Sequence, residues 1–331
     1  MTQFFYFCGH EQFQPEILVK HAQLAEAVGF NGVLVSEHFH PWVDDVSASG
    51  FAWSTLGAIA QTTKTLQLMT AVTTPLWRYH PALVAQAAAT VDRLSGGRFQ
   101  LGVGTGEKIN EGPLGYVFPP YEERAARMRE ALLIIRQLLN GEKLTYRGQY
   151  YQTDRAKLYS PPSKAIPIWL AAGGPKSAKL AAKMADGIVM SVKDPQEAVD
   201  KVLTPYTTEV SSGQQNYQGS NRNVCTMRWV VFAQDNDEAW RALQPWRGLR
   251  SPKRSEAVDP AELRTLTDIL PRQEVLNKFV IVSTVEELIE VYRPLVTVLG
   301  ADIVGIQITS VDQQATIRLL GEQVLPQLSN L

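Results

Sequence analysis

Short hydrophobic runs alternate with longer amphipathic stretches from the amino terminus onward. The first run, Phe4 to Cys8, is aromatic, and it is followed by a stretch from about Pro15 to Val28 that ends before Gly29. A proline in the first turn and a glycine after the last turn are typical of a helix. The next run, residues 31–36, is rich in valine and leucine. The pattern predicts a strand, a helix and a second strand. The apolar helix face is expected to comprise Leu18, Ala22, Ala25 and Val28.

The same unit repeats along the chain. About eight strands joined through helices by short connections require parallel pairing, which favours a closed (β/α)8 TIM barrel of the α/β class. An open, doubly wound sheet is the alternative. A late helix is expected to begin with the capping box Ser283-Thr284-Val285-Glu286. The other expected strands are 66–72, 99–104, 167–172, 187–191, 224–233 and 302–309, and the other helices about 53–61, 81–93, 121–139 and from Pro175.

The chain is longer than the roughly 250 residues of a typical barrel, so part of it must form insertions. We expect residues 1–331 to form a single barrel domain with insertions near 107–120, 140–165 and 235–280. The first of these is rich in glycine and proline, the second carries a hairpin-like pattern, and the third holds two tryptophans and a basic cluster. The polar segment from Glu209 to Asn223 predicts a mobile loop.

Composition excludes several functional classes. The chain has 32 basic and 33 acidic side chains, so no overall charge favours nucleic acid or an anionic membrane. The two cysteines, Cys8 and Cys225, are too few for a disulfide framework and fit a reducing cytoplasm. No CxxC or HExxH spacing indicates a metal site, and no segment resembles a signal peptide or a membrane span. We expect a cytoplasmic protein that acts on a small molecule without a metal.

The segment after the second expected strand, Val35 to Trp42, has the composition of an active site. It places His38 beside Glu37 and near Trp42, at the carboxyl end of a strand, where barrel enzymes hold their chemistry. An imidazole titrates near neutral pH and suits proton transfer. A single histidine is often only a structural residue, but this position and these neighbours favour a catalytic role.

Glycines recur where the fourth expected strand ends. Gly102, Gly104 and Gly106 alternate there, followed by Glu107 and Asn110. Because these glycines have no side chains, a flat ligand can approach the backbone closely there. The spacing does not fit the G-x-G-x-x-G dinucleotide fingerprint. We therefore expect a flat cofactor that is not held by a nicotinamide-type motif.

A second glycine pair follows the fifth expected strand. Ala171 to Ser177 runs from a strand into the amino terminus of a helix, through Gly173 and Gly174. Free N–H groups at such a position can hold a cofactor phosphate. An ordinary tight turn is the alternative explanation. In barrels, phosphate sites more commonly follow strands seven and eight, so this position would be a departure.

Several of these motifs together resemble the luciferase-like flavin and deazaflavin oxidoreductases, and most closely the branch of the F420-dependent glucose-6-phosphate dehydrogenases. The resemblance implies a (β/α)8 barrel, usually dimeric, that holds coenzyme F420 across the strand ends with its phosphate tail over Gly173-Gly174. It also implies a cis peptide bond between Ala71 and Val72. The matching motifs are Glu11-Gln12-Phe13, Ser36 to Trp42, Arg78 to Ala82 with Ala85-Gln86-Ala87, Gly102 to Glu107 with Asn110, and Ala171 to Pro175.

The resemblance also implies roles for individual residues. His38 matches the base for the substrate hydroxyl, Trp42 the aromatic residue beside it, Glu107 the carboxylate that helps to protonate the reduced ring, and Glu11 a second carboxylate near the ring. Glu37 stands where the family generally has aspartate. Lys193, Arg254 and Lys278, with Lys253 also available, are the cations late in the chain that could bind a substrate phosphate. The expected cofactor contacts are Glu37, Ala71, Val72, Thr74, Gly106, Asn110, Ala172, Gly173 and Gly174.

Three functions remain open at this point. The first is an F420-dependent oxidoreductase that transfers a hydride between a sugar, sugar phosphate or alcohol and the deazaflavin. The second is an FMN-dependent luciferase-like monooxygenase or reductase. The third is a flavin-binding protein without activity, since a fold does not determine a function. The presence of His38, Trp42 and Glu107 argues against the third.

Overall fold

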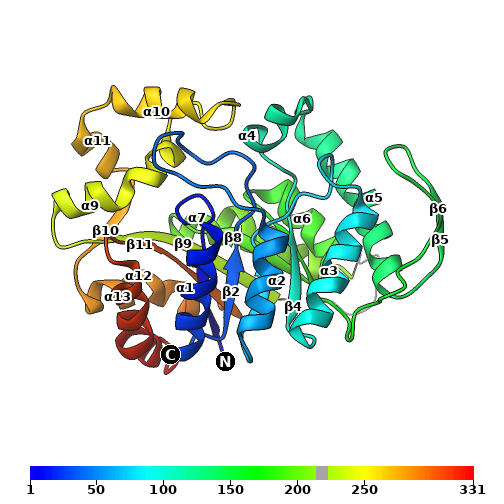
Figure 1. Ribbon diagram of the computed structural model, residues 1–331, viewed down its shortest axis with the longest axis horizontal. Coiled ribbons are helices and arrows are strands. Elements are labelled where there is room, and N and C mark those ends of the chain that lie inside the picture. The colour runs from blue at the N-terminus through cyan, green and yellow to red at the C-terminus, as the bar shows by residue number, and fades with distance from the viewer. Residues whose placement is uncertain (214–222) are drawn as a thin grey trace.

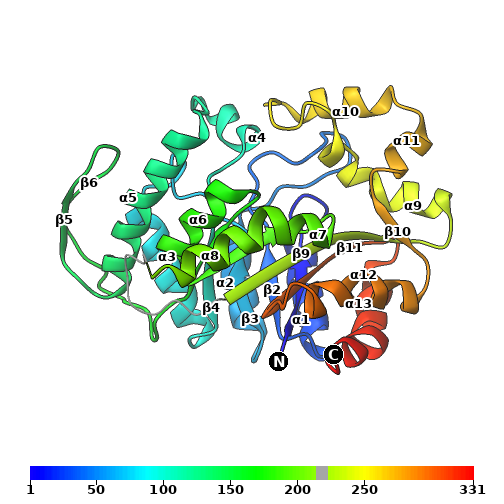
Figure 2. The same ribbon diagram turned by 180° about the vertical axis from the view of Figure 1, so that it is seen from behind.

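The computed structural model describes residues 1–213 and 223–331 and shows a closed barrel of parallel strands (Figures 1 and 2). The ring closes where Gly187 to Ser191 of β8 pair with Asn223 to Met227 of β9. The prediction of a (β/α)8 barrel is therefore confirmed, and the open sheet is excluded. The barrel strands, in ring order, are β1 (Gln3–Cys8), β2 (Gly32–Val35), β3 (Gln67–Thr70), β4 (Phe99–Val103), β7 (Ile168–Ala171), β8 (Gly187–Ser191), β9 (Asn223–Phe232) and β11 (Ile303–Thr309).

Helices connect the strands on the outside of the ring (Figure 1). The predicted capping box lies one residue further along, because Thr284 caps the helix and Glu287 reaches back to its backbone. None of the helices in the described ranges is long and apolar enough to cross a membrane. The connecting helices are α1 (Pro15–Ala27), α2 (Ala52–Thr62), α3 (Pro81–Ser95), α5 (Tyr121–Leu139), α6 (Pro175–Met184), α7 (Pro195–Ala198), α8 (Thr204–Ser211), α12 (Val285–Thr297), α13 (Gln313–Leu319) and α14 (Leu325–Leu328).

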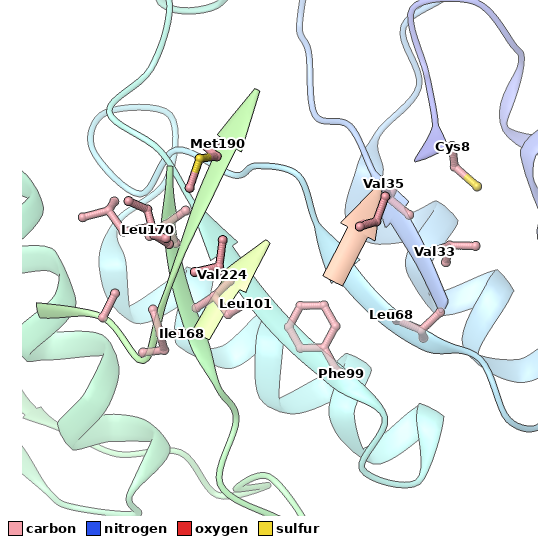
Figure 3. Close-up of a cluster of buried hydrophobic side chains, with 14 of the residues drawn as sticks. Cys8, Val33, Val35, Leu68, Phe99, Leu101, Ile168, Leu170, Met190 and Val224 are labelled. Atoms are coloured by element: carbon pink, nitrogen blue, oxygen red, sulfur yellow. The ribbon is translucent and has the colours of Figure 1, made fainter. Parts of the chain in front are cut away.

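Strand residues alternate between two cores. In β1, Phe4, Tyr6 and Cys8 belong to the core between the barrel and the helices, whereas Phe5 and Phe7 belong to the core inside the barrel. Successive side chains of a strand point to opposite faces, so a strand buried on both faces has no polar positions. Figure 3 shows the outer core, in which Cys8, Val33 and Val35 lie among side chains of neighbouring strands.

The segments predicted as insertions contain elements of their own. The predicted hairpin is present as β5 (Leu144–Arg147) and β6 (Gln152–Ala156), whereas the short α4 (Lys108–Glu111) was not predicted. Residues 235–280 are mostly helical, which their composition did not indicate. They form α9 (Asn236–Leu243), a 3-10 helix (Gln244–Arg250), α10 (Pro260–Asp268), α11 (Arg272–Leu276) and the start of β10 (Val280–Val282).

Part of the segment predicted as a mobile loop is ordered structure. Glu209 to Ser211 belong to α8, and Asn223 opens β9. Residues 214–222, the middle of the predicted loop, lie outside the described residues. Polar composition alone did not reveal that a helix would continue into this segment.

The helical segment 235–280 packs onto the loops that follow β1 and β2. Trp246 donates a hydrogen bond from Nε1 to Gln12 Oε1 at 2.8 Å. Gly248 approaches the backbone of Trp42 so closely that a Cβ atom there would lie 2.0 Å from the Trp42 carbonyl oxygen. Both views place α9, α10, α11 and α4 on one side of the barrel and both chain termini on the other (Figures 1 and 2). This segment therefore covers the end of the barrel where β1 and β2 deliver their polar residues.

Candidate active site

His38 lies between two carboxylates that come from different strand ends. Its Nε2 is 3.4 Å from Glu11 Oε1 and 3.6 Å from Glu107 Oε2. Glu11 follows β1, His38 follows β2, and Glu107 follows β4. The Trp42 ring packs against the imidazole with ring centres 4.8 Å apart. The four residues predicted to be catalytic are thus brought together at the carboxyl end of the barrel.

The hydrogen bonds of His38 determine which of its nitrogens is available. Nδ1 lies 3.0 Å from the carbonyl oxygen of His40. A carbonyl only accepts, so Nδ1 carries the hydrogen and Nε2 of the neutral ring keeps a free lone pair. Glu11 is held in turn by Ser36, whose hydroxyl donates to Oε2 at 2.5 Å. The geometry prepares Nε2 to take a proton and places negative charge where an imidazolium would form.

His40, two residues further on, faces a different partner. Its Nδ1 lies 3.0 Å from the carbonyl oxygen of Val258, in the segment that covers the barrel end. Its ring stacks on Phe39 with centres 5.2 Å apart. His40 therefore joins the loop after β2 to residues 235–280, while His38 faces the carboxylates.

A cavity of about 360 Å³ opens beside His38 and Glu107, within the size range of small-molecule and cofactor sites. Gly174, Glu11 and Trp42 do not line it, although the last two contact His38. Thr105, Ser191 and Met227 line it but were not predicted as contacts, although Thr105 lies within the Gly102-to-Glu107 motif. The predicted site residues that line it are Glu37, His38, Ala71, Val72, Thr74, Gly106, Glu107, Asn110, Ala172 and Gly173.

The walls of this cavity fit a flat ring system. The peptide bond between Ala71 and Val72 is cis, as the resemblance implied. A Cβ atom on Gly104 would lie 2.6 Å from Val72 Cγ2, so only glycine leaves this wall open. Glu37 lines the cavity, and neither of its buried oxygens has a hydrogen bond of normal geometry, although Tyr79 and Arg78 lie beside it. A glycine-lined wall with a carboxylate at its edge suits a flat cofactor with polar ring edges.

Three predicted cofactor contacts are already engaged. The N–H groups of Gly173 and Gly174 are not free, because both donate to the Ser177 hydroxyl, at 3.2 and 3.3 Å. This corrects the expectation of free donors, since a phosphate would have to displace that hydroxyl. Asn110 accepts a hydrogen bond from the Phe39 backbone N–H at 2.8 Å, so its oxygen positions the loop that carries His38.

Cations gather in two further cavities next to this site. Lys193 and Arg250 line both, Arg254 lines the first, of about 540 Å³, and Lys278 the second, of about 360 Å³. Lys253 is exposed and lines neither. The three predicted cations therefore do not meet in one cavity, and Arg250 was missed. The 3-10 helix that aims Arg250 was not predicted from the sequence.

A buried charge cluster lies behind the cavity wall. Arg78 approaches Glu37 Oε1 at 3.7 Å through NH1 and Glu111 Oε1 at 3.3 Å through Nε. One guanidinium thus faces two buried carboxylates. Burial raises the pKa of Glu111 to about 7, with Arg78 opposing the shift and Glu37 adding to it. Glu111 and Arg78 were not predicted as site residues. Arg78 stands in one of the motifs that carried the family resemblance, which was the signal available.

Comparison with known proteins gives consistent matches. The family model described as luciferase-like monooxygenase matches residues 2–301. The F420-dependent glucose-6-phosphate dehydrogenase of Nakamurella multipartita is 36% identical over 332 residues, covering 99% of this chain and 97% of the relative. The F420-dependent hydroxymycolic acid dehydrogenase of Mycobacterium tuberculosis is 38% identical over 279 residues, covering 82% of this chain and 74% of the relative.

The fold agrees with a solved relative over almost its full length. The structure described as an F420-dependent secondary alcohol dehydrogenase in complex with an F420–acetone adduct aligns with a TM-score of 0.88 and 30% sequence identity. The alignment covers 99% of this chain and 99% of that chain.

The Glu111 cluster predicts how stability depends on pH. A carboxyl whose pKa is raised by folding contributes stability that is present below its unfolded pKa and is lost as pH rises through the folded value, here from about 4.5 to about 7. Glu111→Gln mimics the protonated form. Thermal denaturation from about pH 5 to pH 8 should therefore show a smaller loss of Tm for the variant than for the wild type. Glu197→Gln, an exposed carboxyl, is the control, and parallel curves for Glu111→Gln and wild type would contradict the assignment.

Proposed function

The chain belongs to the luciferase-like monooxygenase family, and we propose that it is an F420-dependent oxidoreductase acting on CH–OH groups. The observation that carries the proposal is the free Nε2 of His38, held between Glu11 and Glu107 at the edge of the glycine-lined cavity. The F420-dependent dehydrogenases among its relatives support the cofactor and the reaction class.

Different residues have different roles in the proposed oxidation of an alcohol. Loss of hydride from carbon requires a base on the hydroxyl, and His38 Nε2 accepts that proton. The imidazolium that results is stabilised by Glu11, which Ser36 holds in place. When bound, the deazaflavin supplies the hydride acceptor. The cavity residues Glu37, Ala71, Val72, Thr74, Gly106, Asn110, Ala172 and Gly173, with Gly174 beside them, hold it.

We further propose that the substrate carries an anionic group. Lys193 and Arg250 lie in both cavities. Arg254 and Lys201 add cations to the first, which Asp194 and Glu197 also line, and Lys278 and Arg228 add cations to the second. Arg250 also repels Lys193, so that the pKa of Lys193 is lowered by Arg250 first and then by burial and Arg254. Facing cations of this kind are stabilised when an anion binds between them. A sugar phosphate or another acidic alcohol fits this chemistry.

We propose that the protein is a cytoplasmic homodimer that binds no nucleic acid. Its two cysteines are buried free thiols, which fits a reducing compartment. Exposed Leu83 and Leu94 on α3, with Phe51 before α2, offer apolar surface on outer barrel helices.

Light scattering should return roughly twice the 36.8 kDa of one chain. A mass near that of one chain would refute the dimer.

The cofactor proposal predicts tighter binding of F420 than of FMN to the cofactor-free protein. The preference should appear as a lower Kd in a fluorescence titration with each cofactor. Equal or tighter FMN binding would instead favour an FMN-dependent monooxygenase or reductase.

A substitution at Gly173 tests whether the Gly173-Gly174 turn contributes to cofactor binding. A Cβ on Gly173 would meet nothing within 4 Å in the described structure, so Gly173→Val leaves the fold intact. It should weaken F420 binding by obstructing close backbone approach, with Tm unchanged. An unchanged Kd would make the turn purely structural.

The catalytic proposal predicts different effects for the two neighbouring histidines. His38→Ala should lower the rate of hydride transfer by about 100- to 10,000-fold with F420 affinity largely kept. His40→Ala should cost less, because His40 contacts Val258 rather than the carboxylates. Single-turnover measurements of F420 reduction check both. Equal rates for wild type and His38→Ala, or a larger loss at His40, would overturn the assignment.

A further inference from the structure

Arg254 lies at the junction of the proposed anion site and the proposed proton-transfer site. It lines the cavity that holds Lys193 and Arg250, while its NH2 lies 3.2 Å from Glu107 Oε1. Its guanidinium also lies over the Trp42 ring, 5.2 Å from the ring centre. Glu107 belongs to the neighbouring cavity beside His38, and the two cavities share Gly173 and Ser191. A single side chain therefore contacts both sites.

Arg254 differs from Lys193 and Arg250 in having a carboxylate partner, as does Lys201 of the same cavity, which pairs with Glu197. Among the described residues, no carboxylate lies within ion-pair distance of Lys193 or Arg250. The pKa of Arg250 is lowered by burial and then by Arg254, so the guanidinium groups also repel each other. An anion between these cations would be attracted by Arg254 as well, and would compete with Glu107 for it.

The energies favour the exchange. The side chains of Arg254 and Glu107 are 39% and 40% exposed. An ion pair with that much solvent contact contributes little to stability, so little opposes its opening. A hydrogen bond between an arginine and a multiply charged anion is among the strong ones, particularly where other cations add to the attraction. The anion should therefore win the competition for Arg254.

The loss of Arg254 changes the surroundings of Glu107. His38 Nε2 remains at 3.6 Å, with Glu11 on the other side of the imidazole, and Lys108 follows along the chain. The ionised carboxylate thereby loses its nearest fixed cation and gains an anion nearby. Both changes favour the neutral acid.

We infer that Arg254 couples the two sites: an anionic substrate draws Arg254 from Glu107, and Glu107 then takes up one proton from solvent. No electrons move in this step, in which a carboxylate and a proton become a carboxylic acid. The inference rests on the proposed function, in which a protonated Glu107 would serve as an acid beside the cofactor cavity. Glu107 would be such an acid only when the anion is bound. Arg254 acts through Glu107 and is a positioning residue for this step.

Anion binding to the cofactor-free protein tests the coupling. Sulfate is the probe, because it keeps its charge over the relevant pH range, and calorimetry in buffers of different ionisation enthalpy counts the protons taken up. Wild type should bind sulfate more tightly at about pH 5.5 than at about pH 7.5, with proton uptake, because linkage is reciprocal. Glu107→Gln frees Arg254 and should tighten sulfate binding at the higher pH by roughly two- to fivefold. It should also abolish most of the uptake.

Arg254 variants distinguish exchange from simple charge repulsion. Arg254→Gln should weaken sulfate binding, and adding Glu107→Gln to it should bring no gain. Arg254→Lys keeps the charge and should retain the pH dependence. Lys253→Gln, the exposed neighbour, should bind sulfate like wild type.

Two results would overturn the inference. One is equal tightening by Glu107→Gln with and without Arg254, and the other is absence of sulfate binding to wild type. Failure of F420 to bind would refute the proposed function instead, and would leave the exchange standing, because the sulfate titrations contain no cofactor.

Discussion

The close packing of Gly248 against the backbone of Trp42 is the contact on which the rest of the site depends. No other residue fits there, since a Cβ would lie 2.0 Å from the Trp42 carbonyl oxygen. Arg247 beside it is almost fully buried and bonds to Asp45 at 2.6 Å and to Asp268 at 3.0 Å. Charges buried in this way are costly unless they are paired, so Asp45 ties the segment to the loop after β2, while Asp268 pairs with Arg247 within the segment. The position of the segment decides where Arg250 and Arg254 stand relative to His38.

At the site, one basic side chain faces two carboxylates in each of two clusters. His38 lies between Glu11 and Glu107, and Arg78 lies between Glu37 and Glu111. Burial raises the pKa of Glu111, with Arg78 opposing the shift and the Glu37 charge adding to it. A proton in such a cluster is sensitive to any charge that enters.

Family membership leaves the substrate open. The relatives are described as dehydrogenases of glucose 6-phosphate, of hydroxymycolic acid and of secondary alcohols, which share a CH–OH group and little else. Oxidation of each of these CH–OH groups requires proton removal beside a flat cofactor. The residues that follow β1, β2, β3 and β4 form the site that we propose for this step. The variable part is recognition of the rest of the substrate, and the segment 235–280 places Arg250, Arg254 and Lys278 in the cavities proposed for it. Function is decided by such sites rather than by the barrel.

The sequence by itself determined the order of the barrel strands and the strand ends that carry His38 and Glu107, because hydrophobic periodicity and helix-end signals act over a few residues. The number of strand–helix units favoured a closed barrel over an open sheet. Motifs also sufficed for the family and for the Ala71–Val72 cis bond. The tertiary structure alone decided which side chains meet: Arg254 lies 147 positions from Glu107 in the chain. Likewise, Ser177 occupies the donors of Gly173 and Gly174, and an unpredicted helix aims Arg250. Such pairings follow from ring closure and the docking of a distant segment, which local spacing does not encode.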